Sequence, residues 1–303
     1  MKPKELGVLN PAGAGSIDSM RVLTDAEVKA ITEANEGLVQ FQFMEQLFSI
    51  VALSRDAFSD FTNSSFNQYR QDTSASLLGM IPRSAGARKL TLLANMYLLN
   101  FFTAMRTYLD HVETRIKRWY GDKSPEVAQF KSAVSKQYDT TDSYAFVYKL
   151  RNYSQHCGMP IGGIALSASV APDKEIFGTL VDGSGSRALR VYFDRDNLLR
   201  EFDSWGAKVK SYLSAQDKEI EVTVHINNAF ASLCIIHEEV AAQTRKRARN
   251  HAKTLNRFVA EVRTTWPDCD PVIMQQSETD PKCYTIHGFM LDEIALLLSG
   301  VTT

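Results

Sequence analysis

The residues with the clearest capacity for chemistry lie in the stretch KLRNYSQHCGMP, which covers residues 149–160. It contains Arg151, Asn152 and His156. A guanidinium donates two parallel hydrogen bonds to a phosphate, and an imidazole changes its charge near neutral pH. Arg151 and His156 could therefore bracket one substrate phosphate, if their helix ends in a cleft or faces the same helix of a second copy. The alternative is that all three are ordinary polar residues at a helix end.

A helix that stops just after His156 is predicted to carry these residues. Apolar residues follow helical spacing before it, and Thr141 or Asp142 can cap its start. Gly158 can take the left-handed conformation that closes a helix, and Pro160 prevents continuation. His156 then lies in the last turn, where unpaired carbonyl groups favour a protonated imidazole by roughly 0.3–2 kcal/mol.

The faces of this helix separate the polar residues. At about 100° per residue, Asn152 and His156 lie four positions apart on one face, whereas Arg151 and His156 are about 140° apart. Arg151 and His156 therefore cannot form a simple side-by-side pair.

Two long helices are predicted earlier in the chain. Thr24 and Glu27 have the spacing of a capping box at the start of a helix from about 25 to 60. Glycines and a proline predict a loop at 73–86. The stretch 87–121 is apolar all round in its first half, which predicts a central helix buried on every side.

Polar residues mark the second half of that central helix and the start of the next. Arg106 and Asp110 are four apart and can pair, either as support for an active site or as a salt bridge on the helix flank. Ser124 followed by Pro125 predicts the start of a short connecting helix.

The hydrophobic period changes to two after the motif helix. Residues 163–172 and 188–195 alternate in polarity, and the Gly-rich segment DGSGSR lies between them. They predict a small antiparallel sheet of two or three strands. Alternation at 219–226 leaves strand or helix start open. Further helices are predicted at 194–213, 227–262 and 291–300, with a strand pair between the last two.

These patterns predict a mainly α protein, a helical bundle with a small antiparallel β-sheet inserted after the motif helix. Residues 1–20 contain Pro, Gly and Ser and are expected to form a flexible leader. Residues 21–303 are expected to form one mainly helical domain. Its parts are a core at 21–160, the β insertion at 161–195, and further long helices with the C-terminal strand pair at 196–303.

One basic stripe is predicted on the last long helix. Four residues recur every four positions, namely Arg245, Arg249, Lys253 and Arg257. Such a stripe can follow the phosphate backbone of RNA. The alternative is a solvated helix face whose charges pair with nearby acidic residues.

Composition limits the other classes of function. Lys plus Arg number 34 against 35 for Asp plus Glu, so any polyanion site must be local. The four cysteines are far apart and are interpreted as reduced thiols of a cytoplasmic protein. Cys283, His287 and Cys269 come closest to a metal cluster, but the alternation around them favours a strand, so no metal or cofactor is predicted. No apolar run approaches the roughly 20 residues that cross a bilayer.

The motif helix also resembles a known family. Arg151, Asn152 and His156, with four residues between the arginine and the histidine, resemble the R-x4-6-H motif of the HEPN superfamily. HEPN domains are helical bundles with this motif on a later helix, and the order of helices from 88 to 158 is similar. The resemblance covers about 25–160.

The resemblance implies a metal-independent endoribonuclease that acts as a homodimer on RNA. His156 would then be the general acid or base at the ribose 2′-hydroxyl or the leaving oxygen, Arg151 would stabilise phosphate charge, and Asn152 would orient the imidazole or phosphate. The product would be a 2′,3′-cyclic phosphate. Many such proteins are toxins or antiviral defence effectors, so a neutralising antitoxin partner is a further expectation.

Two alternatives remain open at this stage. One is a non-catalytic HEPN-like module that binds a nucleotide or a protein in the same cleft. The other is a helical scaffold in which Arg151 and His156 only complete the helix end. Motif residues buried in the protomer core would favour the scaffold, and motif helices that face each other across a twofold axis would favour the nuclease.

Overall fold

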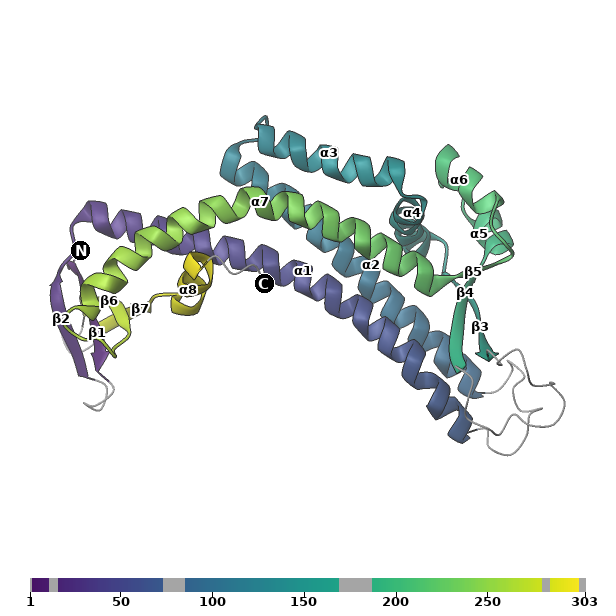
Figure 1. Cartoon of the computed structure of the whole chain (residues 1–303), viewed down its shortest axis with the longest axis horizontal. Helices are drawn as coiled ribbons and strands as arrows, with labels where there is room; N and C mark the ends of the chain where they lie inside the picture. The colour runs from purple at the N-terminus through teal and green to yellow at the C-terminus, as the bar shows by residue number, and fades with distance from the viewer. Residues whose placement is uncertain (1, 11–15, 73–84, 169–186, 280–283, 300–303) are drawn as a thin grey trace. The chain divides into compact units, whose positions relative to one another are not determined.

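Figure 1 shows the computed structural model of the chain, which describes residues 2–10, 16–72, 85–168, 187–279 and 284–299. In chain order its elements are β1 (Lys4–Asn10), β2 (Ser16–Val22), α1 (Asp25–Asp72), α2 (Ala85–Tyr120), α3 (Pro125–Thr140), α4 (Asp142–His156), β3 (Ile161–Ala168), β4 (Arg187–Asp194), α5 (Arg195–Glu201), α6 (Ala207–Ser214), β5 (Glu219–Glu221), α7 (Val222–Arg263), β6 (Pro271–Gln276), β7 (Tyr284–Gly288) and α8 (Leu291–Ser299). The predicted mainly α class with a small inserted antiparallel sheet is confirmed. The predicted loop at 73–86 and the Gly-rich turn before β4 fall almost wholly outside the described residues.

The chain divides into two compact units. The first, here called the sheet unit, comprises residues 1–45 and 240–303, and the second, the helical unit, comprises residues 46–239. The division passes through α1 and α7, so each of these helices contributes to both units. The predicted boundaries at 160/161 and 195/196 both fall inside the helical unit, and the motif helix α4 belongs to it.

The core of the helical unit is built largely by α2 and α4. Phe101, Phe102 and Tyr108 of α2 and Tyr144 and Phe146 of α4 are at most 1% exposed. Burial of such large apolar side chains is the main favourable contribution to folding. α2 and α4 also contact each other, and both contribute aromatic side chains to the buried interior of the unit.

The prediction that the first half of α2 is buried on every side is wrong. Leu92 is 65% exposed and Met96 is 43% exposed. An apolar side chain in the sequence does not fix how many neighbours pack around its helix, and protein surfaces retain many apolar atoms.

The inserted sheet has the order β3-β4-β5, with antiparallel pairs throughout. β5 pairs with the end of β4, and α7 begins at the next residue, Val222, so the alternating stretch is a short strand followed by a helix start. Gly162 is required where β3 meets β4, because a Cβ there would lie 2.4 Å from the backbone nitrogen of Asp194.

The single helix predicted for 194–213 is two helices, α5 and α6. The Asp194 side chain caps α5 by accepting from the N–H of Asn197 at 3.0 Å. Gly206, with φ +77°, precedes α6. Between them Trp205 is 1% exposed and donates its indole N–H to the Leu198 carbonyl at 3.0 Å. The chain breaks the helix here because this geometry buries the indole with its N–H satisfied.

The sheet unit contains a four-stranded antiparallel sheet of order β2-β1-β6-β7. The predicted flexible leader is therefore wrong, because residues 4–10 and 16–22 form its first two strands. Leu6 and Val8 are fully buried, and β1 pairs with β6 near the other end of the chain. Pairing over such a sequence separation leaves no local signal. The predicted C-terminal strand pair is confirmed as β6 and β7.

The predicted helix starts are confirmed at α1 and α3. The Glu27 N–H donates to Thr24 Oγ1 at 3.3 Å, and the Thr24 N–H donates to Glu27 Oε2 at 2.8 Å, as a capping box requires. Ser124 caps α3 by accepting from the Val127 N–H, with Pro125 in the first turn. Each signal operates within three residues.

Replacing Thr24 by alanine is expected to lower the free energy of unfolding by about 1 kcal/mol, because the Glu27 N–H then loses its acceptor. Chemical denaturation measures the change. Thr32→Ala on the exposed side of the same helix is the control, since its hydroxyl bonds only to the Val28 carbonyl. A loss in the control as large as in Thr24→Ala would contradict the capping role.

None of the helices in the described ranges combines the length and the apolar character needed to cross a bilayer.

Candidate functional site

α4 is fixed in the helical unit by its apolar face. Phe146 and Leu150 are fully buried, and Tyr153 is stacked on Trp205 with ring centroids 5.9 Å apart and planes at 15°. Phe146 also lies edge-on to Phe193 of β4. Phe146, Leu150 and Tyr153 follow one another by four and three positions and so lie on one face of α4, and their burial fixes which face of the helix is turned inward.

The motif side chains lie on the outer part of this helix. Arg151 and Asn152 are half-buried, and His156 is exposed. Arg151 donates through Nη1 to Asn152 Oδ1 at 3.4 Å. Neither residue makes a hydrogen bond to His156 within the described chain. The amide of Asn152 therefore orients the guanidinium in this structure, and its predicted action on the imidazole stays a prediction.

The helix ends where the sequence predicted, but by a different geometry. Cys157 is the C-cap, and its N–H donates to the Tyr153 carbonyl at 2.8 Å. Gly158 has a near-extended backbone, with φ +158°, instead of the predicted left-handed helical one. His156 is thus the last residue of α4, next to the unpaired carbonyls of its end.

The segment after the motif is anchored by a residue that sequence analysis missed. Asn95 of α2 is 4% exposed, and its Oδ1 accepts from the backbone N–H of Ile161 at 3.2 Å, while its Nδ2 donates to the Thr91 carbonyl. The anchor sets where the chain leaves α4 toward β3. A polar residue in an apolar helix was the only available signal, because its partner lies 66 positions away.

Arg106 and Asp110 form the predicted ion pair, with Nη2 and Oδ1 2.8 Å apart. Arg106 also donates through Nη1 to the hydroxyl of Tyr148 on α4 at 2.8 Å. Tyr148 lies one turn before Arg151. The pair is therefore more than a salt bridge on the helix flank, because it joins α2 to the motif helix through Tyr148, which sequence analysis did not single out.

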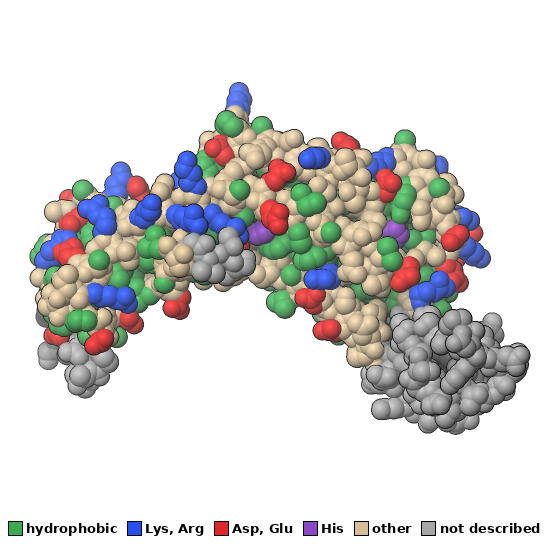
Figure 2. All heavy atoms as spheres, in the orientation of Figure 1, with side chains coloured by type: hydrophobic (Ala, Val, Ile, Leu, Met, Phe, Trp, Pro, Cys, Tyr) green, Lys and Arg blue, Asp and Glu red, His purple; other side chains and the backbone are tan. Residues whose placement is uncertain are grey.

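The basic stripe lies in the sheet unit, on α7. Lys and Arg side chains gather along this helix in Figure 2. Arg249, Lys253 and Arg257 are exposed and Arg245 is half-buried. Arg249 donates through Nε to the Leu297 carbonyl at 3.2 Å, near the end of α8. Arg249 therefore also satisfies a carbonyl at the C-terminal end of α8. Cationic side chains are favoured at this end of a helix.

The charges of the stripe are not neutralised by neighbours. No ion pair links Arg245, Lys253 or Arg257 to an acidic residue in the ranges that the structure describes. The pairing with nearby acidic residues is thus not seen for these three side chains, and the alternatives of a solvated face and an RNA-binding stripe both stay open. Uncompensated cations on one helix face produce a local positive potential on a chain of near-zero net charge.

The described residues contain no group of three or more His, Cys, Asp or Glu arranged to hold a metal ion. His287 lies on β7, as the alternation predicted, and Cys269 has a free thiol. Cys283 lies outside the described residues.

Comparisons with protein-family models, with curated proteins and with solved structures find no match to this chain.

Proposed function

We propose that this protein is a HEPN-type endoribonuclease that cleaves RNA by attack of the ribose 2′-hydroxyl on the adjacent phosphate. The observation that supports the proposal best is the position of His156, exposed at the end of a helix whose other face is firmly packed. Arg151 is half-buried on the same helix and donates a hydrogen bond to Asn152. The imidazole can exchange the 2′-hydroxyl proton and the guanidinium can neutralise phosphate charge, so the two residues supply the groups that phosphodiester cleavage without a protein nucleophile requires.

In the proposed reaction the 2′-oxygen forms a bond to phosphorus while the bond from phosphorus to the 5′-oxygen breaks. One imidazole removes the 2′-hydroxyl proton, and a proton is delivered to the departing 5′-oxygen, so the products are a 2′,3′-cyclic phosphate and a 5′-hydroxyl. Arg151 neutralises the charge that grows on the phosphate oxygens. His156 is the base, and solvent water supplies the proton for the 5′-oxygen. In a homodimer the Arg151 and the His156 that act on one phosphate can belong to one chain or to two.

The exposure of the motif residues bears differently on the two alternatives, the helical scaffold and the non-catalytic binding module. A scaffold role would favour motif residues in the protomer core, whereas His156 is exposed. A module that binds RNA or a nucleotide without cleaving it uses the same exposed groups, so cleavage itself must be measured. A role as a cytoplasmic toxin or antiviral effector, with a neutralising partner, belongs to the same proposal.

The test is incubation of the purified protein with RNA in EDTA, followed by analysis of the fragment ends. We expect fragments with 2′,3′-cyclic phosphates. A substrate with one 2′-deoxynucleotide at a mapped cleavage position is expected to resist cleavage there, because the nucleophile is absent. Cleavage that stops in EDTA, or that continues at the deoxy position, would contradict the mechanism, and binding without cleavage would favour the non-catalytic module.

The stripe on α7 yields a separate prediction about affinity. Changing Arg245, Lys253 and Arg257 to glutamine is expected to reduce the slope of log K against log salt by about 0.7 for each phosphate of single-stranded RNA that is no longer neutralised. Fluorescence anisotropy with an uncleavable deoxy-substituted RNA measures this slope. Lys29→Gln is the control, since that exposed lysine already pairs with Glu33. An unchanged slope in the triple variant would show that RNA does not follow α7.

A further inference from the structure

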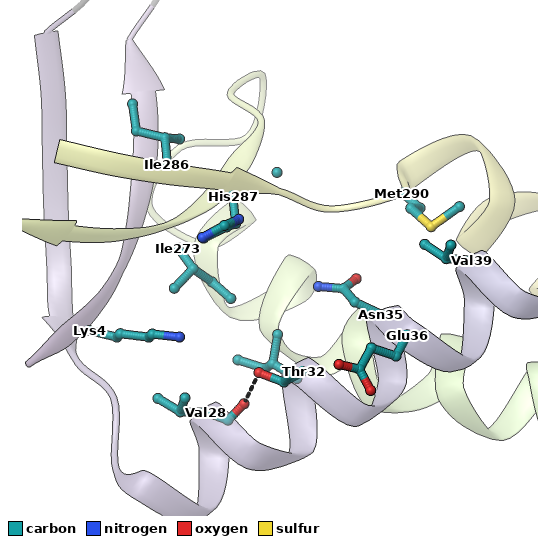
Figure 3. Close-up of a pocket in the computed structure, with 12 residues that line it drawn as sticks. Lys4, Val28, Thr32, Asn35, Glu36, Val39, Ile273, Ile286, His287 and Met290 are labelled. Atoms are coloured by element: carbon teal, nitrogen blue, oxygen red, sulfur yellow. Dashed lines mark hydrogen bonds between the residues drawn. The ribbon is translucent and has the colours of Figure 1, made fainter.

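A pocket of about 460 Å³ lies wholly within the sheet unit, between the sheet and the first turns of α1 (Figure 3). Its volume is in the range of small-molecule sites. The lining comes from five parts of the unit, which are β1, α1, β6, β7 and the segment before α8. The pocket is separate from α4, so its function does not depend on the proposed nuclease.

The sheet side of the pocket is set by strand register. Leu6 of β1 pairs with Ile273 of β6, and Ile273 pairs with His287 of β7, so these three residues share one face of the sheet. Lys4 lies two positions before Leu6 and therefore on the same face. Register thus places one ammonium, one imidazole and one branched apolar side chain along the wall.

The helix side is set by the spacing of α1. Val28, Thr32, Asn35 and Val39 follow one another by four, three and four positions, which puts them on one face. Glu36 lies beside them, one turn after Thr32. The Thr32 hydroxyl already donates to the Val28 carbonyl at 2.8 Å. The polar groups available to a ligand on this side are consequently the amide of Asn35 and the carboxylate of Glu36.

These polar groups are not satisfied by the protein itself. The side chains of Lys4, Glu36 and His287 make no hydrogen bond or ion pair with any residue in the described ranges, although two of them carry opposite charges. Asn35 Oδ1 is buried without a partner among the described residues. Because that oxygen has almost no accessible surface, the free charged groups that a ligand can reach are the side chains of Lys4 and Glu36.

The charges and the apolar residues around the pocket together define the class of ligand that it can bind. Figure 3 shows Lys4, Ile273 and His287 on the sheet side and Val28, Asn35 and Glu36 on the helix side. The complement is a small molecule with an anionic group for Lys4, an N–H-rich cationic group for Glu36, and an apolar body. No Phe, Tyr or Trp of the described chain lines the pocket, so it offers no stacking surface of that kind for a nucleobase.

We propose that this pocket binds a zwitterion of amino-acid or dipeptide size with an apolar side chain. Its carboxylate lies at Lys4, its ammonium lies at Glu36, and its side chain contacts Ile273 and Val28. Each charged end meets a group of opposite sign that has no partner in the described part of the free chain. Both ends are therefore needed for affinity.

Isothermal titration of the full chain tests the proposal with L-leucine, L-leucyl-L-leucine, the N-acetyl and C-amide forms of the dipeptide, and AMP. We expect the free amino acid or the free dipeptide to bind. Blocking either end is expected to weaken binding about tenfold, the size of one charge-assisted hydrogen bond. Absence of binding by both leucine and the dipeptide, equal binding of blocked and free forms, or binding of AMP in preference to both would overturn the proposal.

Protein variants show whether the assigned ends are correct. Glu36→Gln is expected to bind the free dipeptide about as weakly as wild type binds its N-acetyl form, with little further loss on acetylation. Lys4→Met should lose discrimination against the C-amide in the same way. Glu33→Gln and Lys29→Met, on the same helix but outside the pocket, are the matched controls. Equal losses in the controls would refute the site, and thermal unfolding of each variant excludes misfolding as the cause.

Discussion

Replacing His156 by alanine is expected to reduce RNA cleavage by about 10²–10⁴-fold, because the 2′-hydroxyl loses the group that exchanges its proton. Arg151→Ala is expected to cause a loss of similar size, since the phosphate charge is then unneutralised in the transition state. Single-turnover cleavage in EDTA measures both. Gln155→Ala is the matched control, because Gln155 is exposed on the same last turn of α4.

The melting temperatures of these variants show whether a loss of cleavage comes from lost catalysis or from lost folding. His156 is exposed and makes no hydrogen bond within the described chain, so His156→Ala should leave the melting temperature almost unchanged. A cleavage rate that survives in His156→Ala, or that falls equally in Gln155→Ala, would contradict the assignment of the site.

A mixing experiment asks whether Arg151 and His156 act within one chain or across two. The variants Arg151→Ala and His156→Ala are each inactive in the proposal, and they are combined under conditions that exchange subunits. If a site combines Arg151 of one protomer with His156 of the other, each mixed dimer retains one intact site, and roughly a quarter of wild-type activity returns. If both residues act within one chain, no activity returns.

Acidification is expected to lower stability through His225, by about 3 kcal/mol between pH 6.5 and pH 4. This residue of α7 is 5% exposed and lies edge-on to Phe146 and Tyr212, with its Nδ1 3.0 Å from the Ser143 hydroxyl. Burial lowers the pKa of His225 from 6.5 to about 4, because the protonated form would lose its hydration.

The direction of this pH effect on the free energy of unfolding follows from proton binding. Between these two pKa values the unfolded chain binds a proton at His225 and the folded chain does not. The free energy of unfolding therefore falls by about 1.4 kcal/mol for each pH unit below 6.5, and the group contributes nothing to the pH dependence well above it.

Denaturation of wild type and His225→Asn across about pH 4–8 measures this contribution. Asparagine retains a hydrogen-bonding group near Ser143 but does not titrate, so the variant should lose the part of the slope that His225 contributes, even though it is less stable at neutral pH. His251, whose pKa is also lowered by burial, keeps its own contribution. Acidic residues with lowered pKa values, such as Glu27 at about 2, act at lower pH. His287→Gln, on an exposed strand, is the control and should keep the wild-type slope. The same slope in His225→Asn as in wild type would show that another group is responsible.

The helices were predictable where their signals are local. The capping box at Thr24 and the Ser124–Pro125 start each operate within three residues, and the structure has both. The period-two stretches around Ile164 and Val191 became the inserted sheet for the same reason. Such signals depend on side chains that lie a few positions apart on one stretch of backbone, so a short window of sequence contains them.

Long-range partners were not predictable. The first strand pairs with β6, more than 260 positions away, and the N-terminal residues were therefore mistaken for a leader. Tyr148 is 42 positions from Arg106, and nothing near either residue indicates the other. The exposure of Leu92 has the same origin, because burial depends on which elements pack nearby.

The sequence by itself determined that an arginine, an asparagine and a histidine share the last turns of one helix, because helical period and a glycine-proline stop are local properties. It also determined a basic stripe on a late helix. Only the tertiary structure decided that His156 is exposed while Arg151 is half-buried, and that Arg249 also donates a hydrogen bond to a carbonyl of α8. The pocket depends on tertiary structure still more, since strand register and helix packing bring Lys4, Glu36 and His287 together from opposite ends of the chain.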